Sequence, residues 1–256
     1  MPEHSPESEP APVALITGAA ARIGASIARH LHQRGYRVII HYHHSAQAAE
    51  ALSSELNTQR PDSSSTSSAD LSDIDEVEAL AHRAIERWGQ LDALVNNASS
   101  FYPTPLPHAD QKQWQDLLGS NLKGPFFLCQ ATSKELMARR GAIVNISDIH
   151  AAQPLHKHSI YSIAKAGNVM LTKTMAQELA PHVRVNGIAP GAILWPENNP
   201  SENAEQIQAK ILKAIPLQRM GSPEDIALLA AFLITNAHYM TGQTIAVDGG
   251  KHLANI

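Results

Sequence analysis

Hydrophobic positions along this chain follow two alternating patterns. Short continuous apolar runs, which predict buried strands, occupy residues 13–17, 37–41, 91–95, 142–146, 183–188 and 244–247. Between them, apolar residues recur at helical spacing in residues 22–33, 45–58, 73–88, 111–139, 161–179 and 223–235. We expect the long helix over residues 111–139 to bend near Gly124-Pro125, because proline interrupts helical hydrogen bonding. Apolar strands that alternate with helices are typical of a parallel sheet covered by helices.

A serine-rich segment, residues 60–68, interrupts this alternation. Strand propensity alone makes it a loop, whereas the repeated order of strand and helix asks for a third strand there. With that strand, the pattern predicts an α/β fold: a single Rossmann-type, doubly wound parallel sheet of about seven strands with helices on both faces. This domain would span residues 13–256. Residues 1–12 are rich in proline and glutamate and lack an apolar run, so we expect a disordered tail without a secretory signal.

Composition narrows the class of protein. Hydrophobic residues make up 43% of the 256 positions and aromatic residues only 5%, which predicts an aliphatic, alanine-rich core. The formal net charge of −4 gives no general attraction to nucleic acid or anionic lipid, and no apolar run is long enough to span a bilayer. Cys129 is the single cysteine and cannot form an intrachain disulfide, which suits a reducing compartment. We expect a cytoplasmic protein with no nucleic-acid or membrane partner.

Two stretches suggest a dinucleotide. Gly18 and Gly24 flank the turn between the first strand and the first helix, where backbone N–H groups and the positive helix end face a phosphate; a tight turn that binds nothing has the same pattern. The second strand ends in the run His41-Tyr42-His43-His44-Ser45. An acid near this position binds the ribose of NAD, whereas donors bind the 2′-phosphate of NADP, so the run favours NADP. A solvated histidine cluster or a metal site are the other interpretations, and the metal site lacks further ligands nearby.

Tyr161 and Lys165 are four residues apart and therefore share one face of a helix. A positive neighbour lowers the pKa of a tyrosine, which then serves better as proton donor or acceptor near neutrality. Such pairs also occur by chance on amphipathic surfaces. Here the run Asn96-Asn97-Ala98 follows a buried strand, at the sheet edge where ligands bind in α/β folds, and Asp148 lies thirteen residues before Tyr161.

Several motifs occur in the order known from one family. They are Thr17-Gly18 with Gly24, Asn96-Asn97-Ala98, Asn121, Tyr161 with Lys165, and Pro190-Gly191. Through them the chain resembles the short-chain dehydrogenase/reductase family over residues 13–250. This resemblance covers nearly all of the predicted domain.

Within that family the chain looks most like the pteridine reductases. Arg22 replaces the second glycine of the common motif, and Ser99 replaces the glycine that usually follows Asn-Asn-Ala. Asp148 stands where most members have a catalytic serine, and Ser147 is one position away. The runs 41–45 and 97–105 also resemble those of pteridine reductases. Two differences are His44, which replaces an arginine of some relatives, and Trp195, which replaces a threonine common after Pro-Gly.

The resemblance implies an NADPH-dependent enzyme that acts on CH–NH groups. It would transfer hydride to a C=N bond of a dihydropterin, biopterin or dihydrofolate and give the tetrahydro form. The implied cofactor residues are Gly18, Arg22, Ile23, Gly24, His41, His43, His44, Ser45, Asp70, Leu71, Asn97, Ala98, Ser99, Tyr161, Lys165, Pro190 and Gly191. The implied substrate residues are Arg22, Ser99, Phe101, Asp148 and Tyr161, with Phe101 stacked on the pterin. No metal is implied.

Four residues would carry the catalysis. Tyr161 would donate the proton, while Lys165 lowers its pKa and holds the nicotinamide ribose. Asp148 would position Tyr161 or a water and bind the pterin. Asn121 would bind a water that links the lysine to solvent.

Two other functions stay open: an NADPH-dependent carbonyl or 3-oxoacyl reductase of the same fold, and a non-catalytic NADPH-sensing protein. Phe101 and Asp148 argue against the first, and the complete set of Asn121, Tyr161 and Lys165 argues against the second. In relatives, the long helices around Asn121 and Tyr161 form a four-helix subunit interface, which implies a homotetramer. Residues 195–205 are polar and contain proline, so we expect a mobile lid there.

Overall fold

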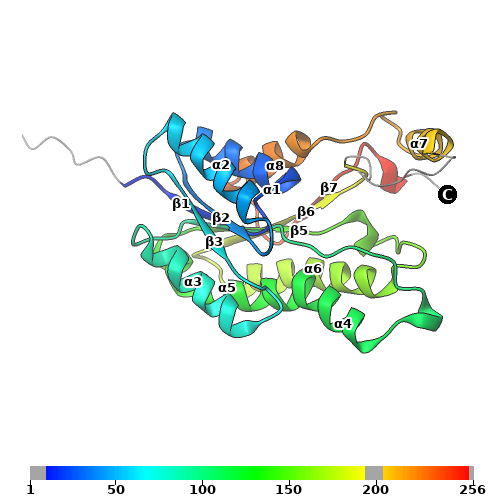
Figure 1. The fold of residues 1–256 in the computed structure, drawn as a ribbon, viewed down its shortest axis with the longest axis horizontal. Coiled ribbons are helices and arrows are strands. Elements are labelled where there is room, and N and C mark those ends of the chain that lie inside the picture. Colours follow the sequence, from blue (N-terminus) through cyan, green and yellow to red (C-terminus); the bar gives the residue numbers. More distant parts are fainter. Residues whose placement is uncertain (1–9, 194–203, 254–256) are drawn as a thin grey trace, which may run out of the picture.

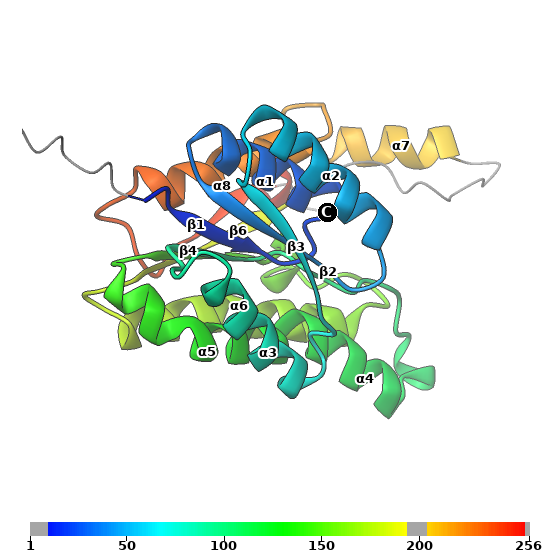
Figure 2. The ribbon, with the colours of Figure 1, turned by 60° about the vertical axis from the view of Figure 1, so that its left-hand side comes forward.

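The computed structural model describes residues 10–193 and 204–253. Most of the expected N-terminal tail and of the expected lid, including Trp195, therefore lies outside the described residues. Figures 1 and 2 show a central sheet between two layers of helices. Within the described part of the chain, no helix combines the length and the apolar character needed to cross a membrane.

The sheet contains seven strands in the order β3-β2-β1-β4-β5-β6-β7, and every neighbouring pair is parallel. The strands are β1 Val13–Ile16, β2 Arg37–Tyr42, β3 Ser64–Ser68, β4 Ala93–Asn96, β5 Ala142–Ile146, β6 Arg184–Pro190 and β7 Thr244–Val247. Strands β1, β4 and β5 are buried throughout, as expected for continuous apolar runs covered on both faces. The predicted Rossmann-type fold is confirmed.

Strand β3 forms from the serine-rich segment despite its low strand propensity. It pairs with β2 from Val38 and Ser64 to Tyr42 and Ser68. The Asn57 side chain supports its start, because its Oδ1 accepts the N–H groups of Ser63 at 3.0 Å and Ser64 at 2.9 Å. Pairing with β2 and these side-chain bonds outweigh the intrinsic preference, and the third strand is confirmed.

Helices cover both faces of the sheet (Figure 1). One layer holds α1 Arg22–Gln33, α2 Ala46–Gln59 and α8 Pro223–Thr235, and the other holds α3 Ile74–Glu86, α4 Gln111–Leu118, α5 Gly124–Ala138 and α6 Ser159–Glu178. Alternate strand residues serve the two layers: Ala14 and Ile16 join one buried cluster, and Val13 and Leu15 join the other. An additional helix, α7 Ala204–Lys213, was not predicted from the sequence.

The long helix expected over residues 111–139 is interrupted just before Gly124-Pro125. Helix α4 ends at Leu118, a π-helical turn spans Gly119–Lys123, and α5 follows. A Cβ atom on Gly124 would lie 2.4 Å from the carbonyl oxygen of Leu71, so only glycine permits this close crossing. Pro125 has no N–H for the Asn121 carbonyl four residues earlier, and the Asn168 side chain donates to that oxygen at 3.3 Å instead. Asn121 lies in this π-helical turn and is buried in the protein interior.

Candidate active site

The segments that follow the strands meet at the carboxyl edge of the sheet and line two adjoining cavities. The first, of about 350 Å³, is lined by the predicted cofactor residues Gly18, Arg22, Ile23, Gly24, His41, His43, Asn97, Ala98 and Ser99. The second, of about 430 Å³, is lined by Asp148, Tyr161, Lys165, Phe101, Pro190 and Gly191 together with Arg22 and Ser99. His44 and Ser45 are exposed next to His43, and Asp70 and Leu71 follow β3. We call these the phosphate cavity and the substrate cavity.

The turn after β1 depends on close backbone contacts. Gly18 has a φ of +60°, and a Cβ atom there would lie 2.9 Å from the Cα atom of Ala98. A Cβ atom on Gly24 would lie 2.4 Å from the Gly18 carbonyl oxygen. Asn97 holds the turn from the neighbouring strand, because its Nδ2 donates to the carbonyl oxygens of Thr17 at 2.8 Å and Gly18 at 3.1 Å. These contacts keep the start of α1 at the cavity.

The N-terminus of α1 has the properties of an anion site. Its N-cap residue, Ala21, offers no side-chain oxygen to the first N–H groups, and the first turn contains no acid. Arg22 is exposed at this end and lines both cavities. Free N–H groups, the positive end of the helix and a guanidinium together fit a phosphate group.

His41 differs from its predicted role as a donor to the cofactor. Its side chain is buried, its Nδ1 accepts the N–H of Gly18 at 3.1 Å, and its Nε2 donates to the carbonyl oxygen of Ala69 at 3.0 Å. Burial lowers the pKa of His41 to about 4, which keeps the ring neutral at neutral pH. Because both ring nitrogens already have partners, His41 braces the glycine turn. The exposed His43 and His44, whose rings stack with centroids 3.5 Å apart, remain as donors.

Tyr161 and Asp148 form the central contact of the substrate cavity. The Tyr161 hydroxyl donates to Oδ2 of Asp148 at 2.7 Å, and Oδ1 of Asp148 accepts the N–H of His150 at 2.8 Å. Lys165 is buried; its Nζ donates to the carbonyl oxygen of Ile146 at 3.0 Å and lies 5.6 Å from the centroid of the Tyr161 ring. The structure thus brings together three of the four predicted catalytic residues.

The electrostatics of Tyr161 contradict the sequence-based expectation. Burial raises the pKa of Tyr161 above its ordinary value, and the charge of Asp148 and the hydrogen bond to it raise it further. Burial also lowers the pKa of Lys165 to about 8, although the charge of Asp148 opposes this. The pKa of Tyr161 therefore shifts upward, through burial first and Asp148 second, opposite to the lowering that we expected from Lys165. Tyr161 is therefore a protonated donor at neutral pH.

Asn121 links the interrupted helix to the segment after β4. Its Oδ1 accepts the Ser99 hydroxyl at 2.7 Å, and its Nδ2 donates to the carbonyl oxygens of Ser100 and Leu117, each at 2.9 Å. This uses the side-chain amide to position the predicted substrate residue Ser99. The predicted water-binding role of Asn121 stays a prediction.

Phe101 is exposed but held from one side. Its ring stacks on His158 at a centroid distance of 4.8 Å and meets the Tyr161 ring edge-on at the same distance. The Thr104 N–H donates to the carbonyl oxygen of Lys157 at 2.6 Å, which ties the Phe101 loop to the start of α6. His158 thus covers one face of the ring, while Phe101 stays largely exposed and lines the substrate cavity. The sequence analysis missed His158, because stacking across two loops leaves no local pattern.

The sequence analysis assigned no role to two further residues of this region, Ser147 and Lys251. Ser147, next to the usual catalytic position, is buried and donates to the carbonyl oxygen of Lys165 at 3.2 Å. Lys251, which follows β7, lines the substrate cavity. Among residues 10–193 and 204–253, no group of three or more His, Cys, Asp or Glu residues is arranged to hold a metal ion.

Comparisons with known proteins agree on one family. A family model described as enoyl-(acyl carrier protein) reductase matches residues 18–252. Pteridine reductase 1 of Leishmania tarentolae is 38% identical to this chain, over 96% of the chain and 98% of that protein. The 3-oxoacyl-[acyl-carrier-protein] reductase FabG of Staphylococcus aureus is 39% identical, over 94% and 98%. Granaticin polyketide synthase putative ketoacyl reductase 2 of Streptomyces violaceoruber is 35% identical, over 95% and 97%.

The neutral state of His41 predicts a specific loss of stability in acid. A folded-state pKa of about 4 against an ordinary 6.5 means that the unfolded chain binds a proton which the folded chain rejects between these values. Stability should therefore fall as the pH falls from 6.5 to 4, by roughly 3 kcal/mol from this group. Urea unfolding at pH 7 and pH 4.5 should show a smaller difference for His41→Gln than for the wild type.

The matched control is His238→Gln, which replaces an exposed histidine. This variant should keep the wild-type difference between the two pH values. An undiminished difference in His41→Gln would show that the pKa of His41 is the same in the folded and the unfolded chain.

Proposed function

The chain belongs to the short-chain dehydrogenase/reductase family, whose members are NAD(P)-dependent oxidoreductases, and on this premise we propose that it is an NADPH-dependent pteridine reductase. The proposed reaction reduces a C=N bond of a dihydropterin, biopterin or dihydrofolate to the tetrahydro form. The observation that carries the proposal is the hydrogen bond of 2.7 Å from Tyr161 to Asp148, beside the exposed ring of Phe101.

An acid at position 148 favours a pterin over a ketone. An ionised carboxylate only accepts hydrogen bonds, whereas a serine hydroxyl also donates them. The carbonyl of a keto substrate needs donors, so Asp148 cannot polarise it in the way that a serine does. A pterin presents N–H groups along its ring edge, and a carboxylate binds such groups strongly. The exposed ring of Phe101 suits the flat pterin, because aromatic stacking fixes the orientation of the pterin.

The residues around the two cavities fit a nicotinamide dinucleotide. The glycine turn and the uncapped α1 suit the pyrophosphate, and the buried Lys165 has protons beyond its bond to Ile146 for a ribose hydroxyl. When bound, the cofactor supplies the hydride. Residues 41–45 contain no carboxylate, and exposed His43 and His44 offer donors to a 2′-phosphate, which supports NADPH.

Tyr161 is suited to deliver the proton that completes the reduction. Its raised pKa keeps the hydroxyl protonated across neutral pH. In the structure described, the hydroxyl donates to Asp148; when pterin N–H groups occupy the carboxylate, the hydroxyl is released and can donate to a ring nitrogen. Asp148 thus binds the substrate and controls the donor. Its other oxygen stays on the His150 N–H and fixes its orientation.

A 3-oxoacyl reductase is the second candidate. It is favoured by the similarity to FabG of Staphylococcus aureus. FabG is 39% identical to this chain, and the pteridine reductase is 38% identical. NADPH oxidation with dihydrobiopterin, dihydrofolate and an acetoacetyl thioester separates the two proposals. If only the thioester is turned over, the proposed pteridine reductase function is refuted and the 3-oxoacyl reductase function takes its place.

Asp148→Ser restores the residue common in the family and is the sharpest test. If Asp148 holds the pterin and the donor, kcat/KM for dihydrobiopterin should fall by about 10²-fold, because a charged hydrogen bond is worth about 1.5–3 kcal/mol and a misplaced donor adds to this. The dissociation constant of NADPH should barely change. Asp148 also caps the 3₁₀ turn Ile149–Ala151, and serine is a capping residue as well, so a purely structural role predicts near-normal turnover.

We expect NADPH to be preferred over NADH, with at least about tenfold higher kcat/KM, because donors and no acid follow β2. His44→Arg should strengthen NADPH binding and leave NADH binding unchanged, because a guanidinium forms two parallel hydrogen bonds to a phosphate and NADH lacks the 2′-phosphate. Steady-state kinetics with both cofactors test this. Equal kcat/KM values for the wild type would contradict the preference.

Two separate apolar surfaces support a homotetramer. Helices α5 and α6 expose Phe126, Ile163 and Met170, and Leu228 and Phe232 lie one turn apart on the outer side of α8. Two different self-complementary surfaces are what a tetramer with three two-fold axes requires. The first surface surrounds an apolar groove lined by Leu122, Phe127 and Leu171 among others.

Phe232→Glu should therefore convert the tetramer to dimers, because it buries a charge in one interface and leaves the α5 and α6 surface intact. Light scattering at micromolar concentration measures the mass. Leu106→Glu is the matched control, since Leu106 is exposed in a separate 3₁₀ turn. A monomeric wild type, or a tetrameric Phe232→Glu, would refute this assembly.

A further inference from the structure

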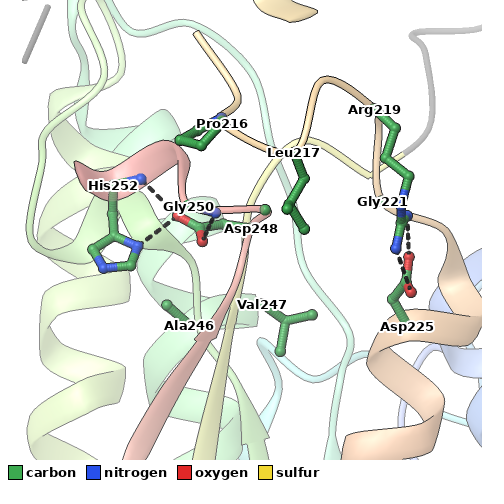
Figure 3. A pocket seen from close by; sticks show the side chains of 11 residues that line it. Pro216, Leu217, Arg219, Gly221, Asp225, Ala246, Val247, Asp248, Gly250 and His252 are labelled. Carbon is green, nitrogen blue, oxygen red and sulfur yellow. Dashed lines mark hydrogen bonds and ion pairs between the residues drawn. The ribbon is translucent and has the colours of Figure 1, made fainter. Parts of the chain in front are cut away.

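The turn after β7 is fixed by Asp248, whose carboxylate is hydrogen-bonded to Gly250 and His252 (Figure 3). The turn contributes to two cavities. Asp248 accepts the N–H of Gly250 at 2.9 Å and the N–H of His252 at 2.7 Å, and the His252 Nδ1 lies 2.8 Å from the same carboxylate. On one side, Gly250 and His252 line a cavity of about 510 Å³. The charged Arg219 of that cavity is paired with Asp225 at 2.9 Å. On the other side, Lys251 lines the substrate cavity.

Lys251 is held at this wall by its neighbours. The Gln153 side chain donates to the carbonyl oxygen of His252 at 2.6 Å, which ties the turn to the segment after Asp148. The Lys251 N–H donates to the carbonyl oxygen of Asp248 at 3.2 Å. The side chain is half-buried, and within residues 10–193 and 204–253 no carboxylate pairs with it.

The substrate cavity is positively charged although the whole chain has a formal charge of −4. Arg22, Lys165 and Lys251 line it, against Asp148 as the acid of the lining. Arg22 also lines the phosphate cavity, and Lys165 is buried below Tyr161. Lys251 lines the substrate cavity and does not line the phosphate cavity.

A ligand that covers a half-buried ammonium removes water from it. A neutral tail leaves that charge without compensation, whereas a carboxylate restores the interaction and forms a charged hydrogen bond. His150 lines the same cavity, but its Nδ1 already donates to the carbonyl oxygen of Gln153 at 2.9 Å, so Lys251 is the donor available to such a group. The free charge therefore selects for a substrate with a negative group beyond its ring.

We infer that the wall formed by Lys251 is a subsite for an anionic tail, so that the favoured substrate is a dihydropterin whose side chain carries a carboxylate, as in dihydrofolate. This inference rests on the proposed pteridine reductase function. It adds the residue that distinguishes a charged tail from the neutral dihydroxypropyl tail of dihydrobiopterin.

The test compares Lys251→Gln and Lys251→Arg with the wild type on both substrates. Lys251→Gln should raise KM for dihydrofolate about three- to tenfold and leave kcat unchanged, the range expected for a partly solvated charge pair. KM for dihydrobiopterin should change by less than about twofold, and Lys251→Arg should retain the wild-type KM for dihydrofolate. Added salt should raise the wild-type KM for dihydrofolate more than that for dihydrobiopterin.

Lys134→Gln, on the exposed side of α5, is the control for loss of a lysine charge. Binding of methotrexate and of 2,4-diamino-6-(hydroxymethyl)pteridine, measured by calorimetry, gives a readout without turnover, because the two share a ring and differ in the anionic tail. Lys251→Gln should weaken only methotrexate. Equal effects on both ligands, or none, would overturn the subsite while dihydrobiopterin turnover keeps the proposed function. A wild type that neither reduces nor binds any pteridine would overturn both.

Discussion

Parallel pairing of the seven strands is the constraint on which the site depends. Gly18, His41, Asn97, Asp148 and Gly191 are far apart in the chain, and each lies at or just beyond the carboxyl end of its own strand. In a parallel sheet these ends share one edge, so the separate segments become the walls of adjoining cavities. The helices and the aliphatic core keep this edge rigid. The close contact between the Gly18 turn and Ala98 shows how little space the arrangement leaves for change.

Burial controls the chemistry at this edge as much as charge does. Tyr161, Lys165 and His41 are all buried, and in each case burial shifts the pKa toward the neutral form. For His41 the result is a rigid hydrogen-bonded support. For Tyr161 the result is a hydroxyl that stays protonated at neutral pH and donates to Asp148. A bound cofactor would change this balance by excluding more water and by adding its own charges near Lys165.

The sequence predicted what depends on short-range pattern. Strand and helix periodicity located the sheet, and even β3 followed from the alternation of elements. Motif spacing located Tyr161, Lys165 and Asp148 in one cavity. It could not show that both His41 nitrogens are used inside the protein, because one partner is 23 residues away and the other 28. The stacking of Phe101 on His158 and the placement of Lys251 arise from loop packing, which has no signature in either segment.

The carboxylate of Asp148 is the feature that supports the proposed pteridine reductase over a 3-oxoacyl reductase. FabG of Staphylococcus aureus and pteridine reductase 1 of Leishmania tarentolae are about equally similar to this chain, so overall identity does not discriminate between them. The proposed distinction rests on hydrogen-bond polarity at position 148. A carbonyl being reduced gains negative charge and needs donors, and an acceptor-only group at 148 would destabilise it. A C=N bond gains a proton on nitrogen, and the neighbouring N–H groups need an acceptor. In the proposed function, Asp148 supplies that acceptor with its Oδ2 2.7 Å from the Tyr161 hydroxyl, and the same acceptor-only group argues against a ketone substrate.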